Sequence, residues 1–452
     1  MNHSTNLSEG HVGKLLFKLS LPAIFAQLIN VFYNMVDRMY IGHIEHIGDI
    51  ALTGVGVTMP LIMAVSAFAA LVSMGGAPRA SIMMGRKQND IAEKILGNSA
   101  ILLVLIALCS TIVILLFGRD LLLIFGASEN TIVYAWDYMR IYAIGTIFVQ
   151  LSLGLNTFIS TQGFTSISMR TTLIGAIMNI ILDPIFIFMF DMGVKGAAFA
   201  TIFSQMISCI WVVSFLCGKK TLLKLRVKNM HLNPEIFLPC IGLGLAPFIM
   251  QFTESILSVS FNTSLLEYGG DIAVGAMTIL TSVMQFSMLP LHGLTQGAQP
   301  IISYNYGANN LNRVKQAFIY LLTSCLIYST ILWAVCMFMP QLFINIFTNK
   351  PELMEYSTLA IRIYMATSCL FGAQIACQQT FIALGNAKTS LFLALLRKVF
   401  LLIPLIYILP NFLETKDIAV FLAEPIADTI AVCTTVLLFT LSFKKILKTS
   451  KN

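Results

Sequence analysis

Charged residues are scarce in this chain of 452 residues: Asp, Glu, Lys and Arg together make up 11% of it, whereas 57% is hydrophobic. Soluble proteins carry about a quarter charged residues. The shortage excludes a soluble enzyme, a disordered chain and a secreted disulfide scaffold. One helical membrane crossing needs about 20 apolar residues, so the length accommodates roughly a dozen crossings with short loops. We therefore predict an all-α polytopic membrane protein.

The chain also lacks the motifs of catalysis and of cofactor binding. None of its nine cysteines forms a C-x-x-C pair, and its six histidines are scattered, with no H-E-x-x-H motif. A nucleotide-binding loop is missing as well, so we expect no enzymatic activity and no cofactor. The net charge of +7 comes from short basic clusters between apolar stretches. Such clusters are topology signals, and we expect no nucleic-acid partner.

Twelve apolar stretches are long enough to cross a membrane. They lie near 15–41, 51–75, 93–117, 131–160, 166–190, 195–216, 236–264, 272–301, 313–339, 353–383, 389–410 and 417–443. Alternate loops and both termini hold almost all Lys and Arg; these loops lie near 86–90, 161–170, 219–231, 307–315 and 385–388. The positive-inside rule places them, and both termini, in the cytoplasm. We expect a multi-pass protein of a bacterial plasma (inner) membrane.

An internal duplication is the most informative pattern in the sequence. Gly48-Asp49-Ile50-Ala51 recurs as Gly270-Asp271-Ile272-Ala273, and Arg140-Ile141-Tyr142 recurs as Arg362-Ile363-Tyr364, each at a shift of 222. The same shift relates further pairs: Gly75 and Gly297, Pro78 and Pro300, Ser81 and Ser303, Gly85 and Gly307. Each copy holds six crossings, so the halves enter the membrane the same way, with a cleft between them. We predict two pseudo-symmetric six-helix bundles, residues 1–216 and 236–452, joined by a basic linker over 217–235.

Few ionisable residues lie well inside a predicted crossing, where a charge costs about 2.5 to 3.5 kcal/mol on insertion scales. They are Asp37, Asp183, Glu254, Glu424 and Asp428. Arg140 and Arg362 lie near predicted helix ends, where snorkelling to the headgroups explains them. For Arg397 and Lys398 we favour a misplaced boundary or snorkelling over a role in the transport pathway.

Asn179 and Asp183 are four residues apart, so they share one face of a helix and can converge on one ion. Thr201 can face that pair from the next crossing, while Asp37 and Tyr33 come from the first crossing and Asn156 from the fourth. Two carboxylates in a low dielectric disfavour each other's ionisation, so such a pair can exchange protons near neutral pH. A lone intramembrane Asn more often joins helices. For the two aspartates we favour function.

Several motifs, taken together, resemble the multidrug and toxic compound extrusion (MATE) family over the whole chain. They are Leu21-Pro22, Tyr33-Asn34, Asp37 and Ile41-Gly42, the stretch Asn179 to Pro184, and Gly193-Val194-Lys195-Gly196-Ala197-Ala198. The resemblance implies a two-lobed, cation-coupled drug antiporter with the MATE fold. In its DinF-like branch the residues matching Asp37, Asn179, Asp183 and Thr201 form the proton or sodium site. The drug cavity of the first lobe would add Tyr33 and Asn156. We also include Asn34 as a substrate-binding candidate.

The resemblance also bears on Pro22 and on the second half. A bend at Pro22 could couple protonation to cavity volume, because proline removes a backbone hydrogen bond; the alternative is that Pro22 marks the first turn of its helix. Glu254 matches a helix 7 glutamate of the NorM-like branch, whereas Gln374 occupies the place of its helix 10 aspartate. We include Glu254 and Gln374 as substrate-binding candidates. Glu424 and Asp428 either join Glu254 or line the cleft.

The predicted function is efflux of lipophilic, mostly cationic drugs in exchange for protons or sodium. Methionine adapts to varied shapes and aromatic faces attract cations, which suits a cleft rich in Met and Phe. A lipid-carrier or oligosaccharide flippase is the alternative, although its cleft should be strongly basic. A channel is harder to exclude. We expect a monomer that contacts membrane lipids.

Overall fold

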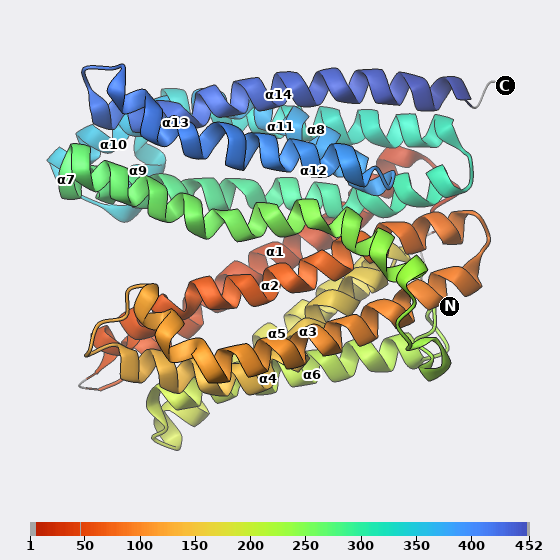
Figure 1. Cartoon of the computed structure of the whole chain (residues 1–452), viewed down its shortest axis with the longest axis horizontal. Coiled ribbons are helices and arrows are strands. Elements are labelled where there is room, and N and C mark those ends of the chain that lie inside the picture. The colour runs from red at the N-terminus through yellow and green to blue at the C-terminus, as the bar shows by residue number, and fades with distance from the viewer. Residues whose placement is uncertain (1–5, 46, 450–452) are drawn as a thin grey trace.

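The computed structural model describes residues 6–45 and 47–449 and is helical almost throughout (Figure 1). The first half contains α1 (Val12–Gly42), α2 (Gly48–Gly85), α3 (Asn89–Ile124), α4 (Ile132–Thr161), α5 (Thr165–Pro184), the π-helical η1 (Ile185–Met189) and α6 (Gly193–Cys217). A short 3-10 turn, η2 (Val227–Asn229), lies in the linker. The second half contains α7 (Pro234–Gly307), α8 (Leu311–Phe338), α9 (Gln341–Phe347), α10 (Pro351–Tyr364), η3 (Ser368–Leu370), α11 (Phe371–Ala383), α12 (Ala387–Leu395), the π-helical η4 (Leu396–Leu402), α13 (Ile403–Ile408), η5 (Leu409–Asn411) and α14 (Lys416–Thr449).

These helices make twelve membrane crossings within the described residues. Ten helical spans are long and apolar enough to cross, and α10 with α11 forms an eleventh that is bent by 44°. The span assigned to α7 is two crossings, because its 74 residues would measure about 111 Å against a hydrocarbon core of about 30 Å. Gly270 separates them, with a φ of 64° that continues no helix. The predicted number of crossings is confirmed.

The crossings form two lobes that meet where α2 packs against both crossings of α7 (Figure 1). A Cβ atom at Gly85 would overlap the backbone of Tyr304, and one at Gly307 would overlap the backbone of Ile82. The two contacts are equivalent in the internal repeat, because Ile82 corresponds to Tyr304 and Gly85 to Gly307 at the shift of 222. The duplication therefore reappears as a self-complementary contact about a pseudo-two-fold axis.

The lobes pack together at one end only, the end at which α1 begins and α14 ends, called here the terminal end. There Ser20 donates to the carbonyl of Leu294, and Ser81 to that of Pro300. Phe68 and Phe248, with ring centroids 5.1 Å apart, lie nearest the middle. Between them and the opposite, far end, the described residues show no hydrogen bond, ion pair or ring contact across the lobes. Figure 1 shows the helices diverging toward that end.

Helix α1 and the start of α7 cross between the lobes. Leu15, Leu16 and Leu19 of α1 are buried in a core with α7 and α8 of the second lobe. Conversely, Cys240 of α7 belongs to a core formed by α2, α3, α4 and α6. The hydrophobic core of each lobe therefore includes the beginning of one helix from the other half of the sequence.

The linker is anchored on the first lobe. The Oε1 atom of Gln162 accepts hydrogen bonds from the backbone N–H groups of Leu222 and Leu223 and from the Thr221 hydroxyl. Glu93 of α3 forms an ion pair of 3.3 Å with Arg226. The first five and last three residues of the chain, which the topology prediction also assigned to the cytoplasm, lie outside the described residues.

Two predicted crossings needed correction. The second was expected to end near residue 75, but α2 continues to Gly85 through Pro78, because its glycines let the lobes approach closely. The tenth was expected to be one helix and instead bends between α10 and α11. The residues added to α2 are those that close the lobes at the terminal end.

Candidate ion-coupling and substrate sites

The first-lobe site is built around Asp37 of α1 and Asp183 of α5. Both are buried, with exposures of 8% and 0%, and their carboxyl groups lie within hydrogen-bonding reach of each other. Asn179, one turn before Asp183, donates from Nδ2 to Asp183 Oδ1 at 3.3 Å. The structure thus brings together the two aspartates and the asparagine that the sequence singled out.

Thr201 and two tyrosines border this pair. The hydroxyls of Thr201 and Tyr138 are 3.4 Å apart, and Tyr138 lies within electrostatic range of both Asp37 and Asp183. Tyr33 is one turn before Asp37 on α1 and interacts electrostatically with it. Thr201 therefore reaches the site through Tyr138, a residue that sequence reasoning missed. Tyr138 lies four residues before Tyr142 on the same face of α4, and this spacing is the sequence pattern that could have indicated Tyr138.

Oxygen atoms in the first-lobe site are short of partners. Asp37 Oδ1, Asn179 Oδ1 and Asp183 Oδ2 are buried without a hydrogen bond. Arg38 follows Asp37 on α1, but no ion pair within 4 Å joins either aspartate to a basic residue in the described part of the chain. Buried oxygens of this kind suit protons or a hard cation such as sodium. The residues present fit either ion.

Asn156 lies apart from the acidic pair, whereas Asn34 lies three residues before Asp37 on α1. Asn156 Nδ2 donates to the carbonyl of Ser168 at 3.2 Å, and Ser168 is about 22 Å from Asp183 along α5. Asn34 is exposed, and its Nδ2 donates to the Asn30 carbonyl within α1. Of the drug-cavity residues predicted in the first lobe, Tyr33 and Asn34 lie on α1 within one turn of Asp37, and Asn156 lies elsewhere.

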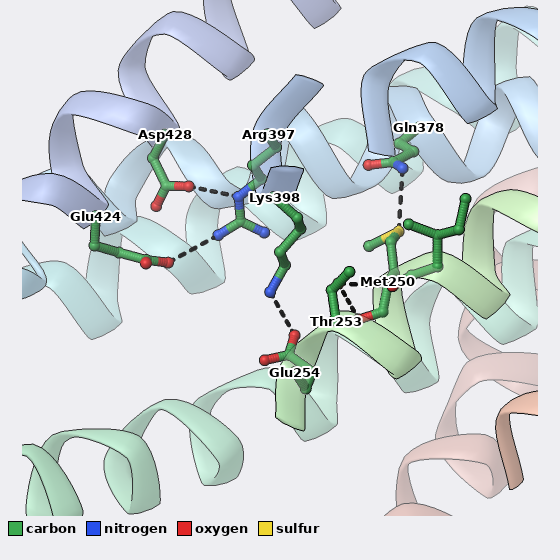
Figure 2. Close-up of polar contacts among 9 residues, drawn as sticks. Met250, Thr253, Glu254, Gln378, Arg397, Lys398, Glu424 and Asp428 are labelled. Carbon is green, nitrogen blue, oxygen red and sulfur yellow. Dashed lines mark hydrogen bonds and ion pairs between the residues drawn. The ribbon is translucent and has the colours of Figure 1, made fainter. Parts of the chain in front are cut away.

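A second polar cluster lies in the second lobe (Figure 2). Arg397 Nε is 2.6 Å from Asp428 Oδ1, and its Nη2 is 3.2 Å from Glu424 Oε1. Lys398 Nζ is 2.5 Å from Glu254 Oε1. The interpretation of Arg397 and Lys398 as boundary or snorkelling residues was wrong: their side chains are 13% and 7% exposed and face carboxylates on α7 and α14. Pairing with carboxylates offsets part of the desolvation cost of burying these two charges.

Gln374 and Gln378 lie on α11, one turn apart. Gln374 Oε1 is buried with no hydrogen-bond partner, and Gln378 Nε2 contacts the Met250 sulfur at 3.1 Å. Phe371, one turn before Gln374, lies under the Arg397 guanidinium at 5.5 Å. Gln374 is therefore a buried amide on the helix that packs against the charged cluster, and within the described part of the chain it forms no hydrogen bond with Glu254.

The local backbone is irregular beside both sites. Pro184 follows Asp183 directly and is succeeded by the π-helical η1, while η4 contains both Arg397 and Lys398. Insertions of this kind re-aim side chains and occur often at functional sites. The repeated tyrosine also borders both sites: Tyr142 interacts with Tyr33, and Tyr364 with Glu424, Asp428 and Glu254.

A comparison with protein-family models shows which family the chain belongs to. The sequence model of the MatE family matches residues 22–185 and again 247–408, almost three quarters of the chain. The protein belongs to the MATE family. The two matched segments begin and end at shifts close to 222, so the family unit coincides with the internal repeat.

Among MATE relatives, the chain is 25% identical over 401 residues to the multidrug export protein MepA of Staphylococcus haemolyticus (strain JCSC1435), covering 89% of this chain and 88% of that protein. It is 25% identical over 402 residues to MepA of Staphylococcus aureus (strain N315), covering 88% and 87%. A MATE transporter in an outward-facing conformation matches with a TM-score of 0.89 at 22% identity, covering 99% of both chains. These findings confirm the predicted fold class, and MATE membership makes the chain a transporter and not an enzyme.

Pro22 of this MATE protein lies within α1, ten residues after its start at Val12. The alternative that it marks the first turn is therefore wrong. It lies where α1 passes from the core of the second lobe to the first-lobe site. A MATE structure in a bent conformation matches with a TM-score of 0.93 and one in a straight conformation with 0.89, each at 22% identity.

Replacing Pro22 with alanine is expected to lower the drug-efflux rate about fivefold while raising the thermal unfolding temperature, since alanine restores a helical hydrogen bond and costs up to about 3 kcal/mol less than proline. Efflux of ethidium and thermal unfolding of the purified protein measure the two effects. Pro60→Ala, within α2, is the matched control. Unchanged efflux by the Pro22 variant would count against a conformational role.

Proposed function

We propose that the protein exports lipophilic cationic compounds in exchange for protons or sodium bound at the first-lobe site. The observation that carries this proposal is the buried Asp37–Asp183 pair, which forms no ion pair within 4 Å with any basic residue among those described. Two ionised carboxylates in contact repel each other, so the site favours a proton or a cation. Asp37, Asn179 and Asp183 would hold the ion, with Thr201 beside it through Tyr138. Multidrug export by the MepA relatives supports the substrate class.

The arrangement of the lobes supports an outward-facing state. The terminal end is closed, and on the proposed topology it is cytoplasmic, with the protein in the plasma membrane as a monomer. The space between the lobes then opens outward, where protons or sodium enter and drug leaves. Exchange of one proton for one monovalent drug moves no net charge. The pH gradient alone then drives it, at about 1.4 kcal/mol or tenfold accumulation per unit.

The charges in the second lobe argue against a flippase for pyrophosphate-linked lipids. Arg397 and Lys398 are paired with three carboxylates, Glu254, Glu424 and Asp428. This cluster therefore lacks the positive surplus that a diphosphate would require.

Ethidium efflux from proteoliposomes tests the proposal and identifies the coupling ion. We expect efflux to depend on a gradient of protons or of sodium, because one of these ions must occupy the acidic pair as drug leaves. Rates are measured in sodium-free buffer at several pH values, and then with a sodium gradient at constant pH. Transport that persists after both gradients are collapsed would exclude the antiporter.

A further inference from the structure

The charged cluster of the second lobe has one exposed member. The Glu254 side chain is 56% exposed, whereas Lys398, which pairs with it, is 7% exposed. Behind them Glu424 and Asp428 are 4% and 1% exposed. Figure 2 shows Lys398 between these two layers, with its ammonium directed at Glu254 and away from the carboxylates of α14. Glu254 is thus the carboxylate that a ligand from outside the cluster reaches first.

The two basic residues are held differently. Arg397 bonds to both Asp428 and Glu424 and lies over the Phe371 ring. Lys398 has a single ion-pair partner, Glu254, within the described residues. A lysine ammonium is a point charge on a flexible stem, whereas the planar guanidinium of arginine fixes its partners. Lys398 is therefore held by fewer contacts than Arg397.

The charge balance leaves a second position for Lys398. Three carboxylates face two basic side chains, so the fully ionised cluster carries one excess negative charge. That excess lies on the Glu424–Asp428 pair, which has only Arg397, and Asp428 Oδ2 is buried without a hydrogen-bond partner. Lys398 already lies within electrostatic range of both carboxylates. His292, on the second crossing of α7, also lies within electrostatic range of Glu254 and is counted as neutral in this charge balance.

We propose that Lys398 is a displaceable internal cation that competes with monovalent cationic substrates for Glu254. A substrate cation entering between the lobes takes the place of the ammonium on Glu254, and Lys398 moves to the Glu424–Asp428 pair. Both parts of the cluster are then neutral: substrate with Glu254, and Arg397 plus Lys398 with the two buried carboxylates. No covalent bond changes. The inference rests on the proposed function only for the chemical class of the substrate.

Equilibrium binding to the purified full-length protein in nanodiscs tests this exchange without any ion gradient. The probe is tetraphenylphosphonium, a monovalent lipophilic cation, and tetraphenylborate is its anionic counterpart of the same shape. Replacing Lys398 with Met removes the competitor, so tetraphenylphosphonium should bind about fivefold more tightly or better, the lower end of typical coupling between two ligands. Lys398→Arg keeps the charge and should change the affinity by less than about twofold on the same scale.

Matched variants separate this mechanism from a general change in charge. Lys388→Met removes an exposed lysine from α12 and should leave binding unaltered. Adding Glu254→Gln to Lys398→Met should abolish the gain, and tetraphenylborate should show none in any variant. Lys398→Gln repeats the test with a polar side chain, and thermal unfolding verifies that each variant is folded.

A structural ion pair predicts the opposite, since loss of Lys398 would weaken or leave unchanged the binding of the cation. Such a result overturns the proposal, as does a gain that survives Glu254→Gln or a complete lack of binding by every variant. Loss of gradient-driven efflux with this pattern of binding intact would instead contradict the proposed function alone. The two inferences therefore fail separately.

Discussion

Replacing Asp37 with asparagine is expected to reduce drug efflux at least tenfold. This corresponds to an activation free energy of transport that is higher by about 1.4 kcal/mol or more. The asparagine keeps the size of the side chain and can still form hydrogen bonds, but it cannot lose or bind a proton at neutral pH. The exchange of ions at the buried pair with Asp183 would therefore stop. Ethidium efflux from proteoliposomes with an imposed gradient measures the effect, normalised to the amount of folded protein.

Asp183→Asn should cause a loss of the same size, and the double variant should be no worse than either single one, because the two residues act as a unit. Asp49→Asn, at an exposed position in the first turn of α2, is the control and should transport normally. Efflux near the normal rate by the Asp37 variant would falsify the first-lobe mechanism.

Leucine in place of Gly85 is expected to reduce transport about fivefold or more by a different route. A Cβ atom there already overlaps the backbone of Tyr304, so a larger side chain would force the lobes apart at the terminal end. Overpacking costs about 1 to 3 kcal/mol, which lowers the population of the closed arrangement by about 5- to 150-fold. Gly307→Leu should have the same effect, because its contact with Ile82 is the pseudo-symmetric equivalent.

The population shift can be measured directly with spin labels at Ile50 and Leu266, exposed residues near the far ends of α2 and of the first crossing in α7. The exposed Cys109, Cys217 and Cys433 are first replaced by serine. We expect a shorter distance between the labels in the Gly85 variant, because opening one end closes the other. Gly56→Leu, whose Cβ meets open space on α2, is the control. Normal transport by both Gly85→Leu and Gly307→Leu would mean that the contact between the lobes at these glycines is dispensable.

The number of crossings and the duplication could be predicted because both depend on local apolar runs and on a fixed shift in the sequence. Helix ends were harder to predict. The run from Gly75 to Gly85 contains glycine and proline, which are helix breakers in isolation, yet it continues α2 because the opposing backbone packs against those glycines. Contacts between distant segments override local propensity here, and a single sequence does not reveal them.

The first-lobe site was predicted where its residues share a helix face, as Asn179 and Asp183 do. Tyr138 was missed because its approach to Thr201 depends on how α4 packs against α6. In the second lobe, the insertion cost of a charge suggested that Arg397 and Lys398 should avoid the interior. Glu424 and Asp428, the partners of Arg397, are about thirty positions along the chain, and Glu254, the partner of Lys398, is 144 positions away. Only the packing of η4 against α14 and α7 shows that these charges compensate one another.

The passage of α1 and α7 between the lobes has a consequence for the ancestry of the protein. The beginning of the first helix of each repeat packs in the hydrophobic core of the other repeat. Two separate copies of a six-helix precursor with this architecture would form a domain-swapped homodimer, held by reciprocal exchange of arms. Gene fusion would then have joined subunits that were already interlocked, and a chain cut within the 217–235 segment should remain associated as two fragments.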